Sequence, residues 1–201
     1  MEIGVDILGG SGNSFRRAVS DTIARLPPQV AAELAQGGVR VVAGRRLTEA
    51  WPALEDQHPP GFPDDATYDN VRGVADLSKP PTAYVAETYR PLGSTDFRAV
   101  ANVPGVLRHE LGHAYDALGE TLRSSAIDLQ EVYSAGVACV RERDRPYLVY
   151  FLQEDGAGVQ ELFAEVFAIF AGGGAAPYAA EAIRRTFPEF LARTRTLMGL
   201  P

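Results

Sequence analysis

The sequence has little cysteine and little histidine. Its 201 residues include one cysteine, Cys139, so an intramolecular disulfide and a cluster of cysteine metal ligands are both excluded. Apolar neighbours on both sides of Cys139 predict a buried thiol rather than a reactive one. Only three histidines occur, which limits any histidine-based site to a small set of candidates.

Long apolar runs and an excess of positive charge are also missing. No stretch reaches the roughly 18 apolar residues that a transmembrane helix needs, so we expect no membrane span. The net charge of -7 argues against a nucleic acid as partner. The first residues carry Glu2 and Asp6 and lack a basic segment followed by an apolar core, so no classical signal peptide is indicated. We therefore expect a cytoplasmic protein, an excised domain, or a protein exported by a non-classical or effector route.

What the sequence does contain is ordinary globular composition, with 46% hydrophobic and 22% charged residues. We expect one domain over residues 1–201. Strand-like segments come first and helical segments follow, which indicates an α+β fold with a small mixed sheet. Within it we expect N-terminal helices and a strand in 1–50, a sheet and a histidine-bearing helix in 60–120, and a helical part in 121–201.

The expected elements follow from hydrophobic periodicity and from glycine and proline positions. We expect strands at 2–8, 39–43, 71–77 and 84–89. We expect helices at 13–26, 29–36, 104–118, 124–140, 160–171 and 178–198, the last interrupted at Pro188. The proline-containing segment 78–81 is typical of a rigid turn, so it predicts a hairpin between the third and fourth strands.

Two of the three histidines lie four residues apart around a glutamate, as His109, Glu110 and His113. Residues i and i+4 of a helix lie on one face, so both imidazoles can bind one cation. Glu110 is rotated by about 100° from His109, so it cannot ligate equally well but can reach a water on the metal. This pattern is typical of a catalytic zinc site with Glu110 as general base.

A catalytic zinc needs a third protein ligand. The zinc class with a third histidine would place it at position 119, which is Gly119, so that class is excluded. The best donors are Glu161 and Glu165, which share one face of an otherwise apolar helix, where two carboxylates are costly without a nearby cation. We assign Glu161 as the ligand and Glu165 as the acceptor for the free ring N–H of His109, with the reverse assignment still open.

These residues resemble the anthrax lethal factor family of gluzincins, which includes the bacterial Pro-Pro endopeptidases. The resemblance rests on His-Glu-Leu-Gly-His-Ala-Tyr-Asp at 109–116, on Glu-Leu-Phe-Ala-Glu-Val-Phe at 161–167, and more weakly on 67–74. It covers roughly residues 60–190. It implies a zincin-like catalytic domain with one Zn²⁺ per chain, with Glu161 at the ligand position and Glu165 behind the ligands.

The resemblance also implies a tyrosine that hydrogen-bonds the developing oxyanion, seven residues before the ligand glutamate. That position is Glu154 here, so the sequence departs from the pattern. Tyr150 would take the role if 155–158 is a four-residue insertion, and Tyr147 is the fallback. A further alternative is that both tyrosines are core or interface aromatics.

In this family an edge strand lies beside the cleft and pairs with the substrate. The segment 84–89 precedes the histidine-bearing helix, so we expect it to be that strand. The residues expected to pair with a peptide are Tyr84, Val85, Ala86 and Glu87.

The resulting hypothesis is a zinc-dependent endopeptidase that acts on a peptide or protein, as a toxin, an effector or a secreted peptidase. The alternatives are a zinc-binding module without catalysis and a zinc amidohydrolase for non-protein amides.

Overall fold

The computed structural model describes residues 2–154 and 156–201, and its main sheet has the strand order β1-β2-β4-β3. Strands β1, β2 and β4 are parallel, and β3 pairs antiparallel with β4 at the edge. A second, two-stranded sheet is formed by β5 and β6. The strand bounds are β1 Gly4–Ile7, β2 Arg40–Gly44, β3 Gly73–Asp76, β4 Thr82–Ala86, β5 Thr88–Tyr89 and β6 Arg98–Ala99.

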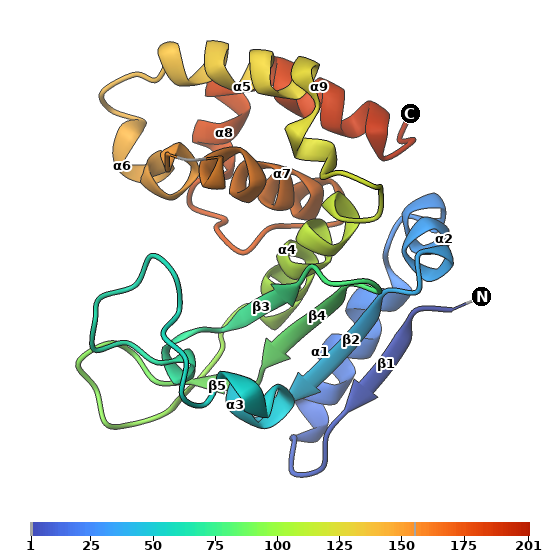
Figure 1. Ribbon diagram of the computed structural model, residues 1–201, viewed down its shortest axis with the longest axis vertical. Helices are drawn as coiled ribbons and strands as arrows, with labels where there is room; N and C mark the ends of the chain where they lie inside the picture. Colours follow the sequence, from blue (N-terminus) through green and yellow to red (C-terminus); the bar gives the residue numbers. More distant parts are fainter. Residues whose placement is uncertain (1, 155) are drawn as a thin grey trace.

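Helices α1 and α2 belong to the sheet half, and most of the others follow it in the chain. Figure 1 shows the sheet in blue to green, the helices α5 to α9 in yellow to red on the opposite side, and α4 crossing between the two. The bounds are α1 Asn13–Ala24, α2 Pro28–Gln36, α3 Leu47–Ala50, α4 Val103–Asp116, α5 Ile127–Ala138, α6 Arg145–Leu148, α7 Ala157–Phe170, α8 Ala180–Thr186 and α9 Pro188–Leu197. The expected α+β class, with a small mixed sheet and a helical C-terminal half, is confirmed.

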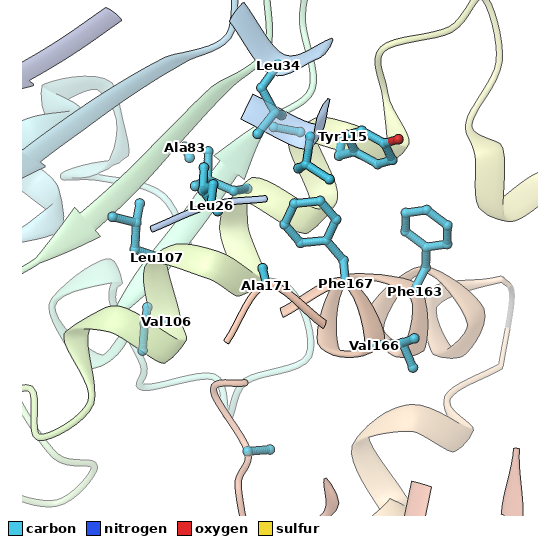
Figure 2. Packing of buried hydrophobic residues seen from close by; sticks show 14 of the residues in the cluster. Leu26, Leu34, Ala83, Val106, Leu107, Tyr115, Phe163, Val166, Phe167 and Ala171 are labelled. Atoms are coloured by element: carbon cyan, nitrogen blue, oxygen red, sulfur yellow. The ribbon is translucent and has the colours of Figure 1, made fainter. Parts of the chain in front are cut away.

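The contact between α4 and α7 lies in the main hydrophobic core (Figure 2). Phe163 and Phe167 project from α7 into this core, and the Phe167 ring lies 5.2 Å from the ring of Tyr115 on α4. The helix axes come close because Gly112 faces α7, where an added Cβ would lie only 2.7 Å from the Cα of Ala164. The two elements that carry the histidines and the glutamates are therefore packed backbone to backbone.

The hairpin expected around 78–81 is present, but the expected edge strand is wrong. Strand β4 is paired on both sides, with β2 and with β3, so Tyr84, Val85 and Ala86 have no free edge. Glu87 lies just beyond β4, in the link to β5. The edge strand is β3, because β4, the second strand of the hairpin, pairs with β2 and therefore lies inside the sheet.

At the open edge of β3, two residues have backbone N–H and C=O groups that do not pair with β4. The carbonyl of Arg72 accepts from the Ala86 amide at 2.9 Å, which sets the antiparallel ladder. In such a ladder, alternate residues counted from Arg72 direct their N–H and C=O groups to β4, and the residues between them direct theirs outward. The backbone groups of Gly73 and Ala75 therefore face the open side.

The single cysteine of the chain lies at the end of a helix. Cys139 follows the last residue of α5 and is exposed, so the expected burial of its thiol is wrong. Its apolar neighbours do not bury it because it lies at the end of the helix rather than on its packed face.

No helix in the described part of the chain is long and apolar enough to cross a membrane.

Candidate metal centre

Two crossing helices position the candidate ligands. Helix α4 begins at Val103, where the side chain of Asn102 accepts from the amide of Gly105 at 3.0 Å and caps the helix. His109 and His113 then follow one helical turn apart on the face toward α7. Helix α7 supplies Glu161 from its second turn. The third histidine of the chain, His58, is exposed, contacts the carbonyl of Pro63 and does not belong to the ligand cluster.

The three expected ligand groups come together in space. His109 Nε2 lies 3.0 Å from Glu161 Oε2 and 3.2 Å from His113 Nε2, and His113 Nε2 lies 3.4 Å from Glu161 Oε2. A tetrahedral zinc with bonds near 2.0–2.1 Å has neighbouring ligand atoms about 3.3 Å apart. The donor set and its spacing therefore fit a zinc ion, with the fourth position left for water or substrate.

Glu165 lies behind the ligands. It is fully buried, and its Oε2 accepts from His109 Nδ1 at 3.1 Å. The carboxylate also accepts from the amides of Ala175 and Ala176 at 3.1 and 2.9 Å. This network holds the ring of His109 with Nε2 toward Glu161 and His113. Of the two glutamates, Glu161 is the one whose carboxylate joins the two imidazoles.

The charges within the cluster are strongly coupled. Burial alone would lower the pKa of His109, but hydrogen bonds to Glu161 and Glu165 outweigh it and raise the pKa to about 10. Burial likewise would raise the pKa of Glu161, and its hydrogen bonds with His109 and His113 instead hold that pKa well below the ordinary value. The cluster thus stabilises positive charge at its centre, which is what a divalent cation would supply.

Glu110 lies between the ligand cluster and the sheet. Its carboxylate lies against β3, where a Cβ added to Gly73 would come within 2.8 Å of Glu110 Oε1 and 2.6 Å of Val106. Burial raises the pKa of Glu110, even though the nearby imidazoles act in the opposite direction. A carboxylate with a raised pKa beside the metal position suits a group that accepts a proton near neutral pH.

The two candidate tyrosines lie in different places. Tyr150, in the 3₁₀ helix η4 (Val149–Leu152), lines both of the cavities that adjoin the candidate ligands. Although the residue is 50% exposed, burial of its hydroxyl end and the carboxylates of Glu161 and Glu110 raise the pKa of Tyr150, so the hydroxyl stays protonated and can donate. Tyr147 is exposed and lines neither cavity among the described residues. Of the insertion proposed at 155–158, Asp155 lies outside the described residues.

A cleft runs past the candidate metal ligands along β3. It consists of two adjoining cavities of about 490 and 260 Å³ that meet at Gly73, His109, Glu110 and Tyr150. The larger lies toward Arg72 and the smaller toward Leu77, so the cleft follows the open edge from one end of β3 to the other. The two cavities together give a cleft that is open along the length of β3.

The residues expected to pair with a peptide lie elsewhere. Tyr84 stacks on Trp51 at 4.8 Å, on the sheet face that does not contact α4. Val85 and Ala86 are fully buried, and Glu87 accepts from the Gly12 amide at the start of α1. None of the four lines the cleft in the described part of the chain, so their expected role is wrong.

Sequence reasoning missed three glycines that shape the site. Gly112 permits the α4–α7 contact, Gly73 makes room for Glu110, and a Cβ on Gly174 would lie 2.0 Å from the Glu165 carboxylate. Only Gly112 left a signal, because a glycine inside a helix costs about 1 kcal/mol relative to alanine and so usually has a packing reason. The other two depend on contacts between segments far apart in the chain.

No protein-family model matches the sequence, and a search of curated proteins finds no match. Among solved structures, a Pro-Pro endopeptidase (PPEP-2) from Paenibacillus alvei is similar over 96% of both chains, with a TM-score of 0.62 and 19% sequence identity. At this identity the likeness is one of fold. The expected zincin-like α+β fold is therefore confirmed, and the chain has the fold of a Pro-Pro endopeptidase.

Proposed function

We propose that the protein is a zinc-dependent endopeptidase of the gluzincin type, resembling the lethal factor family. The observation that carries the proposal is the triad of His109, His113 and Glu161 at ligand spacing, with Glu110 beside it in an open cleft. Bound there, zinc would lower the pKa of a coordinated water toward about 7 and polarise a carbonyl oxygen. The fold shared with a Pro-Pro endopeptidase supports the same reading.

Three residues of the chain would carry out proton transfer, oxyanion stabilisation and positioning of a ligand. Glu110 would accept a proton from the attacking water and deliver it to the leaving amine, as its raised pKa favours. The protonated hydroxyl of Tyr150 would donate to the oxyanion. Glu165 would hold His109 in place through its Nδ1.

Strand β3 would bind the substrate in place of the strand expected from the sequence. A peptide added antiparallel to β3 would pair with the outward backbone groups of Gly73 and Ala75. Its scissile bond would then lie near Gly73, because Glu110 contacts that residue. An extended cleft along a strand edge favours a peptide over the small amides of an amidohydrolase.

The deciding experiment is Glu110→Gln, with the exposed Glu120→Gln as matched control. We expect the first variant to lose hydrolysis of a random peptide library and the second to retain it. Zinc content, measured by elemental analysis, should be one ion per chain in both variants, because neither change removes a proposed ligand. Full turnover by Glu110→Gln would exclude the mechanism, and a wild-type protein that binds zinc but cuts no peptide would favour a non-catalytic module.

A further inference from the structure

Positive charge is unevenly distributed along the cleft. Among the described residues, Arg72 is the one lysine or arginine that lines it, and it lies in the larger cavity. The smaller cavity, beyond Glu110, is lined by no lysine or arginine in the part of the chain that the structure describes. A chain that occupies the whole cleft would meet a fixed cation at one end only.

The position of Arg72 is fixed by an aromatic platform. Its guanidinium carbon lies 4.6 Å from the ring centroid of Tyr89, and its Nη2 lies 3.5 Å from the Tyr89 hydroxyl. Tyr89 is itself held by pairing with Arg98 in the small sheet. Arg40 and Arg46 pair with carboxylates, whereas no ion pair of Arg72 occurs among the described residues. A stacked guanidinium is weakly hydrated and keeps its N–H fork available for a carboxylate.

The direction of a bound peptide then decides which of its residues meets Arg72. A peptide antiparallel to β3 enters near Ala75, passes Glu110 at Gly73 and leaves toward Arg72. With about 3.3 Å per residue, the next two or three residues after the scissile bond lie within reach of this side chain. The residues before the scissile bond lie in the smaller cavity, away from it.

We propose that Arg72, held on Tyr89, selects substrates with a carboxylate within the first three residues after the scissile bond. This inference rests on the proposed peptidase function. The carboxylate could be an Asp or Glu side chain, or the free C-terminus of a short peptide, since both offer the same bidentate acceptor. Because Arg72 is exposed, we expect a preference of roughly fivefold over a neutral residue.

Binding tests this independently of hydrolysis. The probes are peptide hydroxamates, HONH-CO-CH2-CH(isobutyl)-CO-Ala-X-amide with X as Asp, Asn or Lys, whose hydroxamate binds a metal and directs the peptide toward Arg72. A fourth probe has Asn with a free C-terminal carboxylate. Calorimetry on the zinc-loaded protein should show Asp binding about fivefold tighter than Asn and Lys binding weakest. Tighter binding of the free acid than of the Asn amide would identify the C-terminus as a second source of the carboxylate.

Variants separate selection from a structural role. Arg72→Gln should bind the Asp and Asn amides equally, with the Asn affinity and the zinc content of the wild type. Arg72→Glu should prefer Lys, Tyr89→Leu should reduce the Asp preference, and the matched control Arg98→Gln should keep it. Equal binding of Asp and Asn by the wild type, absence of binding by every probe, or an Asp preference that survives Arg72→Gln would overturn the proposal.

Failure of the proposed peptidase function gives a different result. A charge preference among the hydroxamates together with an uncut peptide library would overturn the peptidase and leave the selection of carboxylates standing. A library that is cut without enrichment of acidic residues after the scissile bond, and without enrichment of sites near a free C-terminus, would overturn the role of Arg72 alone.

Discussion

The α4–α7 wall of the cleft is packed and closed, whereas the opposite wall ends in the unpaired edge of β3. On the helical wall, Glu165 is fully buried and its carboxylate accepts from an imidazole and two backbone amides. Gly112 allows direct backbone contact there, so the two helices that carry the proposed ligands are closely packed against each other. On the strand wall, Arg72 is exposed, and Leu92, which also lines the larger cavity, is 50% exposed.

This difference separates two kinds of function. The geometry of a metal site depends on sub-ångström placement, and the packed wall supplies it. Recognition of a peptide depends on exposed side chains and free backbone groups, which the strand wall supplies. Substitutions that disturb the packing or the proposed ligands of the helical wall should therefore change stability or zinc affinity. Substitutions of the outward-facing groups of the strand wall should change substrate binding and leave stability and zinc affinity intact.

The largest effect should come from the two glutamates of α7. Glu161→Ala removes a proposed ligand, and Glu165→Gln removes only an acceptor behind His109, for which a loss of about 10- to 100-fold in metal affinity is typical. We expect zinc affinity, measured by competition with a chelator, to fall further in Glu161→Ala than in Glu165→Gln. A larger loss in Glu165→Gln would reverse the two roles, which the sequence alone left open.

The next largest effect should come from Tyr150→Phe. Removal of a single oxyanion donor typically costs about 10²- to 10³-fold in kcat, so turnover should fall by that factor while KM and zinc content stay unchanged. Tyr147→Phe is the matched control and should behave as the wild type, because that side chain is exposed and, among the described residues, lines neither cavity. Equal losses in both variants would indicate a packing role for this segment instead.

The clustering of the candidate site residues on α4 and α7 could be predicted from the sequence because each pair is local. His109 and His113, and likewise Glu161 and Glu165, lie four residues apart on one helix, so the helical repeat alone places each pair on one face. The two pairs could be assigned to one site because two carboxylates on an apolar helix are costly to bury unless a cation lies nearby. The order of strands and helices was readable for the same reason, since periodicity and turn residues are local signals.

The strand wall could not be predicted in the same way. The segments that form β3 and β4 both looked like strands, and which of them is the edge depends on whether β4 pairs with β2, about forty residues earlier in the chain. The choice of Tyr150 over Tyr147 depends on how η4 packs against α7, which no local pattern encodes. The roles of Gly73 and Gly174 are contacts across the fold, and they become visible only when the segments meet.

Gly112→Ala tests the packed wall, because helix propensity and packing predict opposite effects of this change on stability. Helix propensity predicts that alanine stabilises the interior of α4 by about 1 kcal/mol. The added Cβ would lie 2.7 Å from Ala164, so overpacking should dominate and lower the free energy of unfolding by about 1–3 kcal/mol. Thermal unfolding of the zinc-free protein measures this, with Gly9→Ala as control because a Cβ there meets nothing within 4 Å. A stabilised Gly112→Ala variant would show that the helices are not in tight contact.

The smallest expected effect concerns the open edge and separates β3 from β4 as the substrate strand. Ala75→Pro removes a backbone N–H that faces outward, so it should leave the ladder with β4 intact while deleting one hydrogen bond to a bound peptide. A single such bond contributes about 0.5–1.5 kcal/mol, which corresponds to a rise in KM of roughly two- to tenfold with little change in kcat. Zinc content and melting temperature should stay close to the wild type, because the packed wall is untouched. Val74→Pro is the contrasting variant: its N–H faces β4, so it should destabilise the sheet as well. If Ala75→Pro left KM unchanged, the peptide would have to be held by side chains of the cleft rather than by the edge of β3.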